Sequence, residues 1–383
     1  MRVIVTCGGT GGHVFPGMIT AKALVACGVE VAVLLTDRGI ERSATEWTGT
    51  AFHIRCPKPR WKHPVGFFRS AFGLMGALWQ SAKILRAYRP DAVLAMGSYT
   101  SVGPVVAARL CRIPVVLHDA NVVPGSAVSA LSRFARTVAV SFEKTREYIP
   151  RGVPVVMTGL PIRTYIAGAS PLLESNVAQA PSPVTETALT TGEGVCATKT
   201  TLLVMGGSQG ARTINERILE VFRRMGKEER GTWRVIHLCG HAEEPAMREA
   251  YAALCADGAL EAHLYGFLSE IGKAYASADI CISRAGASSC FELALCELPS
   301  ILIPLPTAAR DHQTANAQAF AAAGAALCLH QADATADRLA DLLKTLQHDT
   351  PRRTAMKAAL RTLAQPDAAN KLADVVIKVA QVF

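Results

Sequence analysis

Short apolar runs alternate with longer stretches of helical periodicity along the whole chain. In the first half the predicted β-strands are Val3–Val5, Val29–Thr36, Asp91–Met96, Pro114–His118, Thr137–Phe142 and Val153–Thr158. In the second half they are Thr201–Met205, Arg234–Cys239, His263–Phe267, Asp279–Ser283 and Ile301–Leu305. Such an alternation is typical of α/β proteins, whose parallel sheets carry helices on both faces. The pattern therefore predicts an α/β fold with parallel sheets.

A glycine-rich turn follows a predicted strand three times, at Cys7–His13, Gly97–Pro104 and Gly206–Arg212. Such turns let backbone N–H groups and the positive end of the next helix approach a phosphate or a crowded sugar. Ligands of parallel sheets bind at the carboxyl ends of the strands, which is where these turns are expected. Because the turns occur in both halves, we predict two similar domains with the chemistry in a cleft between them.

The two halves are joined by a stretch of different composition. Residues 167–200 contain Pro171, Pro181 and Pro183 among many Ala, Ser and Thr, with few charges and little apolar periodicity. We interpret this stretch as a mobile insertion rather than a domain. Beyond Pro366 apolar residues return at helical spacing, which predicts a C-terminal helix.

Length and composition limit the class of protein. The chain of 383 residues is long enough for two domains, and half of its residues are hydrophobic. No run reaches the roughly 18 apolar residues of a membrane-spanning helix, and we see no signal peptide before the first predicted strand. The 11 cysteines include no C-x-x-C pair, which favours reduced thiols over disulfides or a zinc site. We therefore expect a cytoplasmic protein.

The net charge of +9 is concentrated in the first half. Residues 1–165 hold 20 Lys and Arg against 8 Asp and Glu, which gives +12, whereas residues 166–383 hold 20 against 23, which gives −3. A basic half of this kind suits nucleic acid, an anionic membrane surface or a phosphorylated substrate.

Aromatic residues accompany the basic ones in a segment that has no acidic residue between Glu46 and Asp91. The patch consists of Trp61, Phe67, Phe68, Arg69 and Phe72. Large apolar side chains among Lys and Arg are typical of surfaces that dip into anionic lipid. We interpret the patch as a membrane-docking surface, and the alternative is a core helix with a solvated basic back.

The first glycine turn does not match the common nucleotide-binding motifs. Val14 stands where the dinucleotide fingerprint has its third glycine, and no Gly-Lys-Ser/Thr follows as in a Walker loop. Asp37 ends the second predicted strand, where a dehydrogenase has its ribose-binding acid, so that alternative stays open. His13 opens the following helix, whose positive end favours a neutral imidazole. It is a candidate base, or it only caps the turn.

The second half has two polar turns of its own. Ser283–Glu292 leaves a predicted strand, turns at Gly286 and enters a helix, in which Glu292 suits the two hydroxyls of a ribose. The alternative role of Glu292 is a favourable interaction with the helix dipole. Arg310–Asn316 offers amide and hydroxyl groups of the kind that bind sugar hydroxyls.

Together these motifs resemble the MurG family, which belongs to glycosyltransferase family 28. The resemblance rests on Gly8–Pro16, Gly97–Pro104, His118–Asn121, Gly206–Arg212, Ser283–Leu293 and Asp311–Ala317. It implies the GT-B fold, in which two Rossmann-like domains with parallel sheets face each other across a deep cleft. The implied domains are 1–165 with 367–383, which bind acceptor and membrane, and 201–366, which binds UDP-GlcNAc, with 166–200 as a flexible insertion.

The resemblance implies an inverting transfer of GlcNAc from UDP-GlcNAc to the C4 hydroxyl of MurNAc in undecaprenyl-pyrophosphoryl-MurNAc-pentapeptide (lipid I). The product is lipid II, made at the cytoplasmic face of the bacterial inner membrane by a peripheral protein. The implied partners are UDP-GlcNAc, lipid I, the anionic membrane surface and other cell-wall synthesis enzymes, but no nucleic acid. The chain has no Asp-x-Asp pair, so we expect no metal and no cofactor, with a helix N-terminus stabilising the leaving diphosphate.

The resemblance also implies residues for UDP-GlcNAc: Thr10, Gly11, Gly12, Asn121, Arg163, Ser208, Gln209, Leu268, Ala287, Glu292 and Gln313. Ser208 and Gln209 would approach the diphosphate, with Arg163 near the nucleotide. The backbone of Leu268 would hold the uracil and Glu292 the ribose. The GlcNAc would face Gln313 together with Ala287.

On the acceptor side the resemblance implies His13, Tyr99 and Asp119, with His13 and Asn121 close to the reacting centre. Our choice for the catalytic base is His13, with Asp119 as a weaker candidate. The chain departs from the family at His118–Asn121 (HDAN for HEQN), Gly159–Pro161 (GLP for GNP) and Gly97–Tyr99 (GSY for GGY). The alternatives are a GT-B enzyme that glycosylates diacylglycerol, a nucleotide-binding dehydrogenase and a lipid-binding module without a sugar-nucleotide pocket.

Overall fold

The computed structural model of the chain describes residues 1–9, 11–36, 47–56, 64–162, 166, 199–207 and 211–382, with no side-chain description for 64–69 and 71. The chain divides into two compact units. Unit 1 comprises Met1–Arg163 and Gln365–Phe383, and unit 2 comprises Thr164–Ala364. The predicted insertion over 166–200 lies almost wholly outside the described residues, as does Asp37.

Unit 1 is built on a seven-stranded parallel sheet in the order β3-β2-β1-β4-β5-β6-β7. Its strands are β1 (Arg2–Thr6), β2 (Glu30–Thr36), β3 (Thr50–Ile54), β4 (Ala92–Ala95), β5 (Val115–Asp119), β6 (Thr137–Val140) and β7 (Val155–Met157). Successive residues of β2 enter opposite core clusters, Val33 on one face and Leu34 on the other. A strand that is apolar on both sides needs helices on both faces of the sheet.

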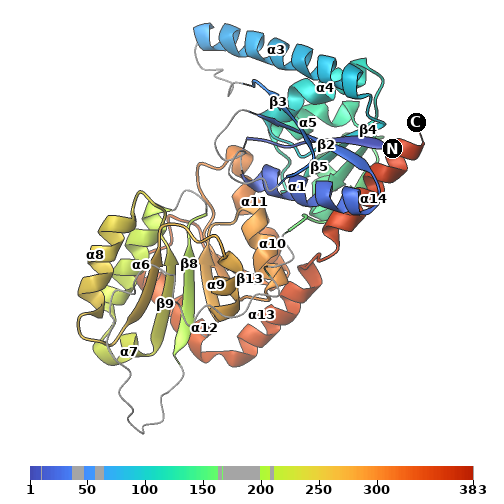
Figure 1. The fold of residues 1–383 in the computed structure, drawn as a ribbon. Coiled ribbons are helices and arrows are strands. Elements are labelled where there is room, and N and C mark those ends of the chain that lie inside the picture. The colour runs from blue at the N-terminus through green and yellow to red at the C-terminus, as the bar shows by residue number, and fades with distance from the viewer. Residues whose placement is uncertain are drawn as a thin grey trace. The chain divides into compact units, whose positions relative to one another are not determined.

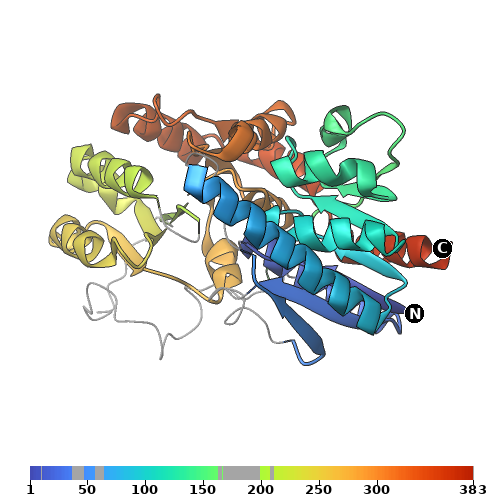
Figure 2. The ribbon, with the colours of Figure 1, turned by 90° about the horizontal axis from the view of Figure 1, so that it is seen from above.

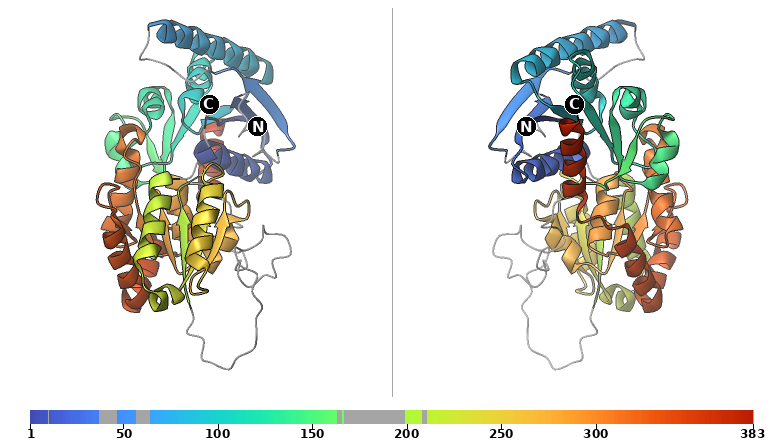
Figure 3. Two further views of the ribbon diagram at one scale, coloured as in Figure 1. Left: turned by 90° about the vertical axis from the view of Figure 1, so that its left-hand side faces the viewer. Right: turned by 90° about the vertical axis from the view of Figure 1, so that its right-hand side faces the viewer.

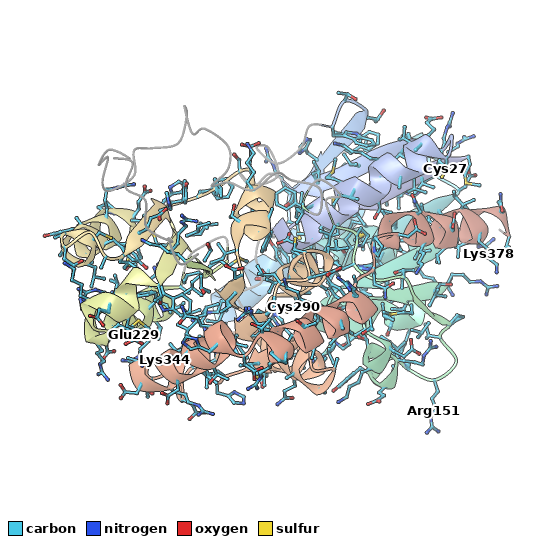
Figure 4. The ribbon with its side chains drawn as sticks, turned by 90° about the horizontal axis from the view of Figure 1, so that it is seen from below. Cys27, Arg151, Glu229, Cys290, Lys344 and Lys378 are labelled. Carbon is cyan, nitrogen blue, oxygen red and sulfur yellow. The ribbon has the colours of Figure 1, made fainter. Side chains whose placement is uncertain are left out.

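Helices cover both faces of this sheet. They are α1 (Gly11–Ala26), α3 (Pro64–Tyr88), α4 (Val102–Leu110), α5 (Ser126–Leu131) and α14 (Ala368–Gln381), with the 3-10 turns η1 (Tyr99–Ser101), η2 (Ser132–Phe134) and η3 (Glu143–Tyr148). On one face α14 packs beside α1, and the neighbouring ends of the two helices are marked by Cys27 and Lys378 (Figures 3 and 4). On the other face α3 packs on α4, and α4 packs beside α5 (Figure 1); α3 runs along the outer side of the unit (Figure 2).

Unit 2 repeats this strand order in a six-stranded parallel sheet, β10-β9-β8-β11-β12-β13. The strands are β8 (Thr200–Met205), β9 (Trp233–Leu238), β10 (Glu261–Tyr265), β11 (Ile280–Ser283), β12 (Ser300–Leu302) and β13 (Ala326–Cys328). In both units the first strand therefore lies in the middle, and the chain moves outward from it in both directions.

The helices of unit 2 are α6 (Arg212–Arg224), α7 (Lys227–Gly231), α8 (Glu244–Cys255), α9 (Ile271–Ser277), α10 (Ala287–Leu295), η5 (Ala309–Asp311), α11 (His312–Ala322), α12 (Ala336–His348) and α13 (Thr350–Leu363). One core cluster joins α6, α8 and α12 to the sheet. Between α10 and α11, Phe291 and Phe320 pack edge to face with ring centres 5.8 Å apart. Away from this core, Lys344 of α12 pairs with Glu229 of α7 at 2.9 Å (Figure 4).

The predicted fold class is confirmed, since both units contain parallel sheets covered by helices. The C-terminal helix is also confirmed, as α14. The sequence analysis missed the edge strands β3 and β13, because β3 is mostly exposed and β13 is only three residues long. β12 ends at Leu302 rather than at Leu305, because Pro304 and Pro306 cannot donate to a ladder. Among the helices of the described residues, none has the length and hydropathy that a membrane crossing requires.

Candidate functional site

Each sheet has a point at which the strand order reverses, between β1 and β4 in unit 1 and between β8 and β11 in unit 2. Ligands of such sheets bind beyond the carboxyl ends of the strands at this switch point. The turns after these four strands include all three glycine-rich motifs and the turn at Gly286. The topology therefore makes both switch points candidate ligand sites.

In unit 1 the two glycine turns pack directly against each other. Gly9 has φ 94°, and a Cβ on it would collide with Ser98 Oγ and lie 3.6 Å from Tyr99 Cε1. Gly97 has φ 81°, and a Cβ there would lie 3.4 Å from His118 O and 3.8 Å from His13 Cε1. Glycine is needed at both positions for its conformation and for this close approach. The contacts bring His13 and Tyr99 to the same switch point.

His13 lies in the first turn of α1 and is partly exposed. The positive end of the helix favours its neutral form, which is the form that accepts a proton. His118 of β5 is buried nearby, and its Nε2 lies 3.0 Å from the carbonyl of Gly159. Burial lowers the pKa of His118 to about 4, so this ring is neutral at physiological pH.

Asp119 organises the turn that carries Asn121. Its Oδ1 accepts the N–H of Asn121 and its Oδ2 accepts the N–H of Gly125, both at 2.9 Å. The carbonyl of Asn121 accepts a bond from Thr145 Oγ1, also at 2.9 Å. A carboxylate that accepts backbone N–H groups is stabilised in its charged form and is a weak base. The Asp119 carboxylate therefore holds the turn that carries Asn121.

In unit 2 the first turn of α6 is tied to the sheet by a buried polar network. Asn215 Nδ2 donates to the carbonyl of Cys239 at 2.9 Å, and Asn215 Oδ1 lies 3.0 Å from His237 Nε2. The other ring nitrogen of His237 lies 2.9 Å from the hydroxyl of Tyr251. This network holds the helix that follows the third glycine turn, and the sequence analysis did not identify it.

Glu292 lies in the second turn of α10, close to the buried Cys290 that is labelled in Figure 4. Its Oε2 accepts a hydrogen bond of 2.8 Å from the hydroxyl of Tyr275, which belongs to α9. Glu292 is only partly buried, so its side chain reaches from the core towards the surface. Tyr275 was not among the predicted site residues, because a tyrosine in an apolar stretch gives no signal of its role.

Arg284 fixes the turn between β12 and α11. This arginine is only 7% exposed, and its guanidinium donates to the carbonyls of Ile303 at 3.2 Å and Pro304 at 3.1 Å, and to Gln331 Oε1 at 2.7 Å. Its pKa is lowered by burial.

Further along the same turn, the N–H of Leu305 donates to Oε1 of Gln313 at 3.0 Å. Because a backbone N–H needs an oxygen acceptor, the NH2 group of Gln313 is the end that points to other partners.

The structure distributes the predicted residues over both units. Leu268, Ala287, Glu292 and Gln313 follow the carboxyl ends of three strands of unit 2. The group Gly11, Gly12, His13, Tyr99, Asp119 and Asn121 lies at the carboxyl ends of β1, β4 and β5 in unit 1. Outside the described residues lie Thr10, Trp61, Arg163, Ser208 and Gln209, together with the side chains of Phe67, Phe68 and Arg69. Phe72 is described and is 77% exposed, so for this residue the core alternative is wrong.

Comparison with known proteins identifies the family. Residues 3–140 match the glycosyltransferase family 28 N-terminal domain, and residues 201–372 match the glycosyltransferase family 28 C-terminal domain. The chain belongs to glycosyltransferase family 28. Its two family domains contain the two switch points described above.

Relatives of known name extend over the whole chain. A protein of Myxococcus xanthus is 34% identical over 98% of this chain and 92% of its own length, and one of Syntrophotalea carbinolica is 35% identical over 97% of both. Both are named UDP-N-acetylglucosamine--N-acetylmuramyl-(pentapeptide) pyrophosphoryl-undecaprenol N-acetylglucosamine transferase. The crystal structure of MurG from Acinetobacter baumannii matches with a TM-score of 0.74 and 30% identity, covering 98% of this chain and 99% of that one. The likeness to the MurG family is thus confirmed in sequence and in fold.

Proposed function

We propose that this chain transfers GlcNAc from UDP-GlcNAc to the C4 hydroxyl of MurNAc in lipid I and so makes lipid II for peptidoglycan synthesis. The observation that carries the proposal is the full-length relationship to transferases of this name, at 34–36% identity. Within this proposal, residues 201–366 bind UDP-GlcNAc and residues 1–165 with 367–383 bind the acceptor.

The donor site that we propose lies at the switch point of unit 2. Glu292 accepts the ribose hydroxyls, the backbone of Leu268 binds the uracil, and Ala287 with Gln313 faces the GlcNAc. Support comes from Gln313, whose oxygen is engaged by the N–H of Leu305 so that its NH2 group donates to the sugar. The diphosphate is assigned to Ser208 and Gln209, with Arg163 at the nucleotide, and the N-terminus of α6 stabilises the leaving charge. Gly11, Gly12 and Thr10 complete the set of residues that we assign to UDP-GlcNAc.

The transfer is an inverting displacement. The C4 oxygen of MurNAc forms a bond to the anomeric carbon of GlcNAc as the bond from that carbon to the UDP oxygen breaks. His13 takes the proton of the attacking hydroxyl, and UDP leaves with the electron pair of the broken bond. Asn121 lies close to the reacting centre, and Tyr99 belongs to the acceptor side. The placement of His13 at the positive end of α1 supports this role, since a neutral imidazole accepts a proton.

The outer side of α3 is the membrane-docking surface in this proposal. Phe72, Met75 and Trp79 are 77%, 64% and 67% exposed and recur at helical spacing, whereas Ala77 and Leu85 are buried. Large apolar side chains exposed at helical spacing form an apolar stripe on the surface, which suits contact with lipid. Lys83 Nζ lies 5.9 Å from the ring centre of Trp79, which adds a basic group beside the aromatic one. We assign the enzyme to the cytoplasmic face of the inner membrane, where anionic headgroups meet this surface.

A transfer assay tests the proposal. Purified protein is incubated with radiolabelled UDP-GlcNAc and a lipid I analogue, beside a diacylglycerol acceptor as control. We expect label in a lipid II analogue and none in glycosylated diacylglycerol. Transfer to diacylglycerol alone would replace the proposed acceptor, and binding of NADH in place of UDP would favour the dehydrogenase alternative.

The membrane assignment has its own test. Replacing Phe72 and Trp79 with Ser removes exposed apolar area, so co-sedimentation with anionic vesicles should fall while UDP binding stays intact. High salt should also weaken the association of the unmodified protein, because exposed charges are screened over about 8–10 Å. Unchanged co-sedimentation of the Ser variant would place the docking surface elsewhere.

A further inference from the structure

A buried phenol lies against the carboxylate that we assign to the ribose. Tyr275 of α9 is 2% exposed, and its hydroxyl donates a 2.8 Å hydrogen bond to Oε2 of Glu292 on α10. We propose that Tyr275 is a positioning residue that holds the Glu292 carboxylate in the orientation that accepts both hydroxyls of the ribose of a uridine diphosphate. This inference rests on the proposed function, because it assumes that Glu292 binds the ribose.

The need for such a residue follows from the flexibility of glutamate. An unrestrained Glu side chain has several rotamers, and ordering it on binding reduces affinity. The ring of Tyr275 is fixed in the core, so its hydroxyl is a donor at a fixed position. A hydrogen bond to an ionised group is about twice as strong as a neutral one, and it holds the carboxylate before the ligand arrives.

The Tyr275 hydroxyl keeps the proton that this hydrogen bond needs. Burial and the neighbouring charge of Glu292 raise the pKa of Tyr275 well above its usual range, so the phenol remains a donor. The thiols of Cys290 and Cys296 also lie near Glu292, and burial with that charge raises the pKa of Cys296 to about 12. Because neutral thiols are weak donors, Tyr275 is the strongest donor of these three neighbours.

The position of Tyr275 in the chain connects two parts of the nucleotide site. α9 begins at Ile271, directly after the turn that contains Leu268, to which we assign the uracil. The same helix carries Tyr275 to Glu292, to which we assign the ribose. A change at Tyr275 should therefore alter the recognition of the ribose most strongly and that of the diphosphate least.

Tyr275→Phe tests the inference because it removes the hydroxyl and keeps the ring. Binding of UDP and of 2′-deoxy-UDP is measured by calorimetry, and the ratio of the two affinities is the readout. We expect Tyr275→Phe to lower the affinity for UDP about tenfold and the affinity for 2′-deoxy-UDP much less, so that the ratio falls. An unchanged ratio would overturn the inference.

Tyr251→Phe is the matched control. Tyr251 is a buried tyrosine of the same unit, and its hydroxyl lies 2.9 Å from His237 Nδ1 rather than near Glu292. Both variants lose one buried hydrogen bond, so both should unfold at a lower temperature. Only Tyr275→Phe should change the affinity ratio, and an equal change in Tyr251→Phe would show a general structural effect and overturn the inference.

Glu292→Gln separates this inference from the proposed function. If Glu292→Gln keeps the affinity ratio, the ribose is bound elsewhere and the proposed donor site fails. If Glu292→Gln lowers the ratio and Tyr275→Phe keeps it, the donor site stands and the positioning role fails. Should Tyr275→Phe not fold, the double variant Tyr275→Phe/Glu292→Gln is used. The amide that replaces the Glu292 carboxylate tolerates the loss of the phenol better than the carboxylate does, because it carries no charge. Its ratio should equal that of Glu292→Gln, and a lower ratio would overturn the inference.

Discussion

In unit 1 the turns at the switch point pack closely around two glycines, whereas in unit 2 they are held by polar side chains that reach in from other elements. A Cβ on Gly9 would collide with Ser98, and Gly97 has φ 81°, a conformation that a side chain would strain. In unit 2, Arg284 binds the turn after β12, and Tyr275 binds Glu292. Two sheets of the same strand order thus stabilise their ligand turns by different means.

The difference has a physical consequence for mutation. A closely packed glycine turn tolerates no added atom, so it should fail when a side chain is enlarged. A turn held by side-chain hydrogen bonds should fail when a side chain is shortened, because buried acceptors then lose their donor. The predictions below test this contrast, beginning with the largest expected effect.

His13→Ala should lower turnover by roughly 100- to 10,000-fold, the usual cost of losing a general base. The affinity for UDP, measured by calorimetry, should change little, because we assign the nucleotide to unit 2. His53→Ala, an exposed histidine of the same unit, is the control and should keep its turnover. Near-normal turnover of His13→Ala would transfer the role of base to Asp119.

Arg284→Met should destabilise unit 2 by about 3 kcal/mol, because the carbonyls of Ile303 and Pro304 lose a buried donor. The affinity for UDP-GlcNAc should fall more than that for UDP, since the same turn orients Gln313 at the sugar. Urea unfolding and calorimetry measure the two effects. Arg361→Met removes an exposed, solvent-screened ion pair and should cost much less stability than Arg284→Met. Equal losses in the two variants would contradict the role assigned to Arg284.

Low pH should destabilise both units through their buried histidines. Burial lowers the pKa of His118 to about 4 and that of His237 to about 3, from about 6.5 in an unfolded chain. At a pH between the folded and the unfolded pKa, the two histidines bind protons in the unfolded chain but not in the folded chain. Stability is therefore fully present above about pH 6.5 and is lost as the pH falls towards 4, by up to about 1.4 kcal/mol per pH unit for each histidine.

Urea unfolding between pH 4.5 and 7 measures this slope. His118→Gln should reduce the slope for unit 1 and His237→Gln that for unit 2, because each variant removes one titrating group. If both variants retained the slope of the unmodified protein, other groups would be responsible for the acid sensitivity.

Ser98→Gly should stabilise unit 1 by about 1–3 kcal/mol. Ser98 has φ 68° and ψ 158°, a conformation that only glycine adopts without strain, and it stands where the MurG family usually has glycine. Ser126→Gly at the exposed start of α5 is the control and should cost about 0.5 kcal/mol. A loss of stability in Ser98→Gly would mean that the contact of its side chain with Gly9 outweighs the strain.

Much of the fold could be predicted from the sequence, because its signals are local. The apolar runs predicted the central strands, and the glycines after β1, β4 and β8 predicted the ligand turns at their carboxyl ends. β3 and β13 were missed, because β3 is mostly exposed and β13 is only three residues long. The motifs also indicated the family, and Glu292, Gln313 and His13 stay predicted site residues.

What only the tertiary structure decided is the set of polar side chains that support these residues. Tyr275 and Glu292 are 17 positions apart, Arg284 and Gln331 are 47 apart, and nothing in their local patterns links them. A buried phenol or guanidinium is stable only where the fold supplies its hydrogen-bond partners, so its role depends on the neighbours that folding brings to it. Asp119 is the same case, since its hydrogen bonds to the backbone of Asn121 and Gly125 form only in the folded turn.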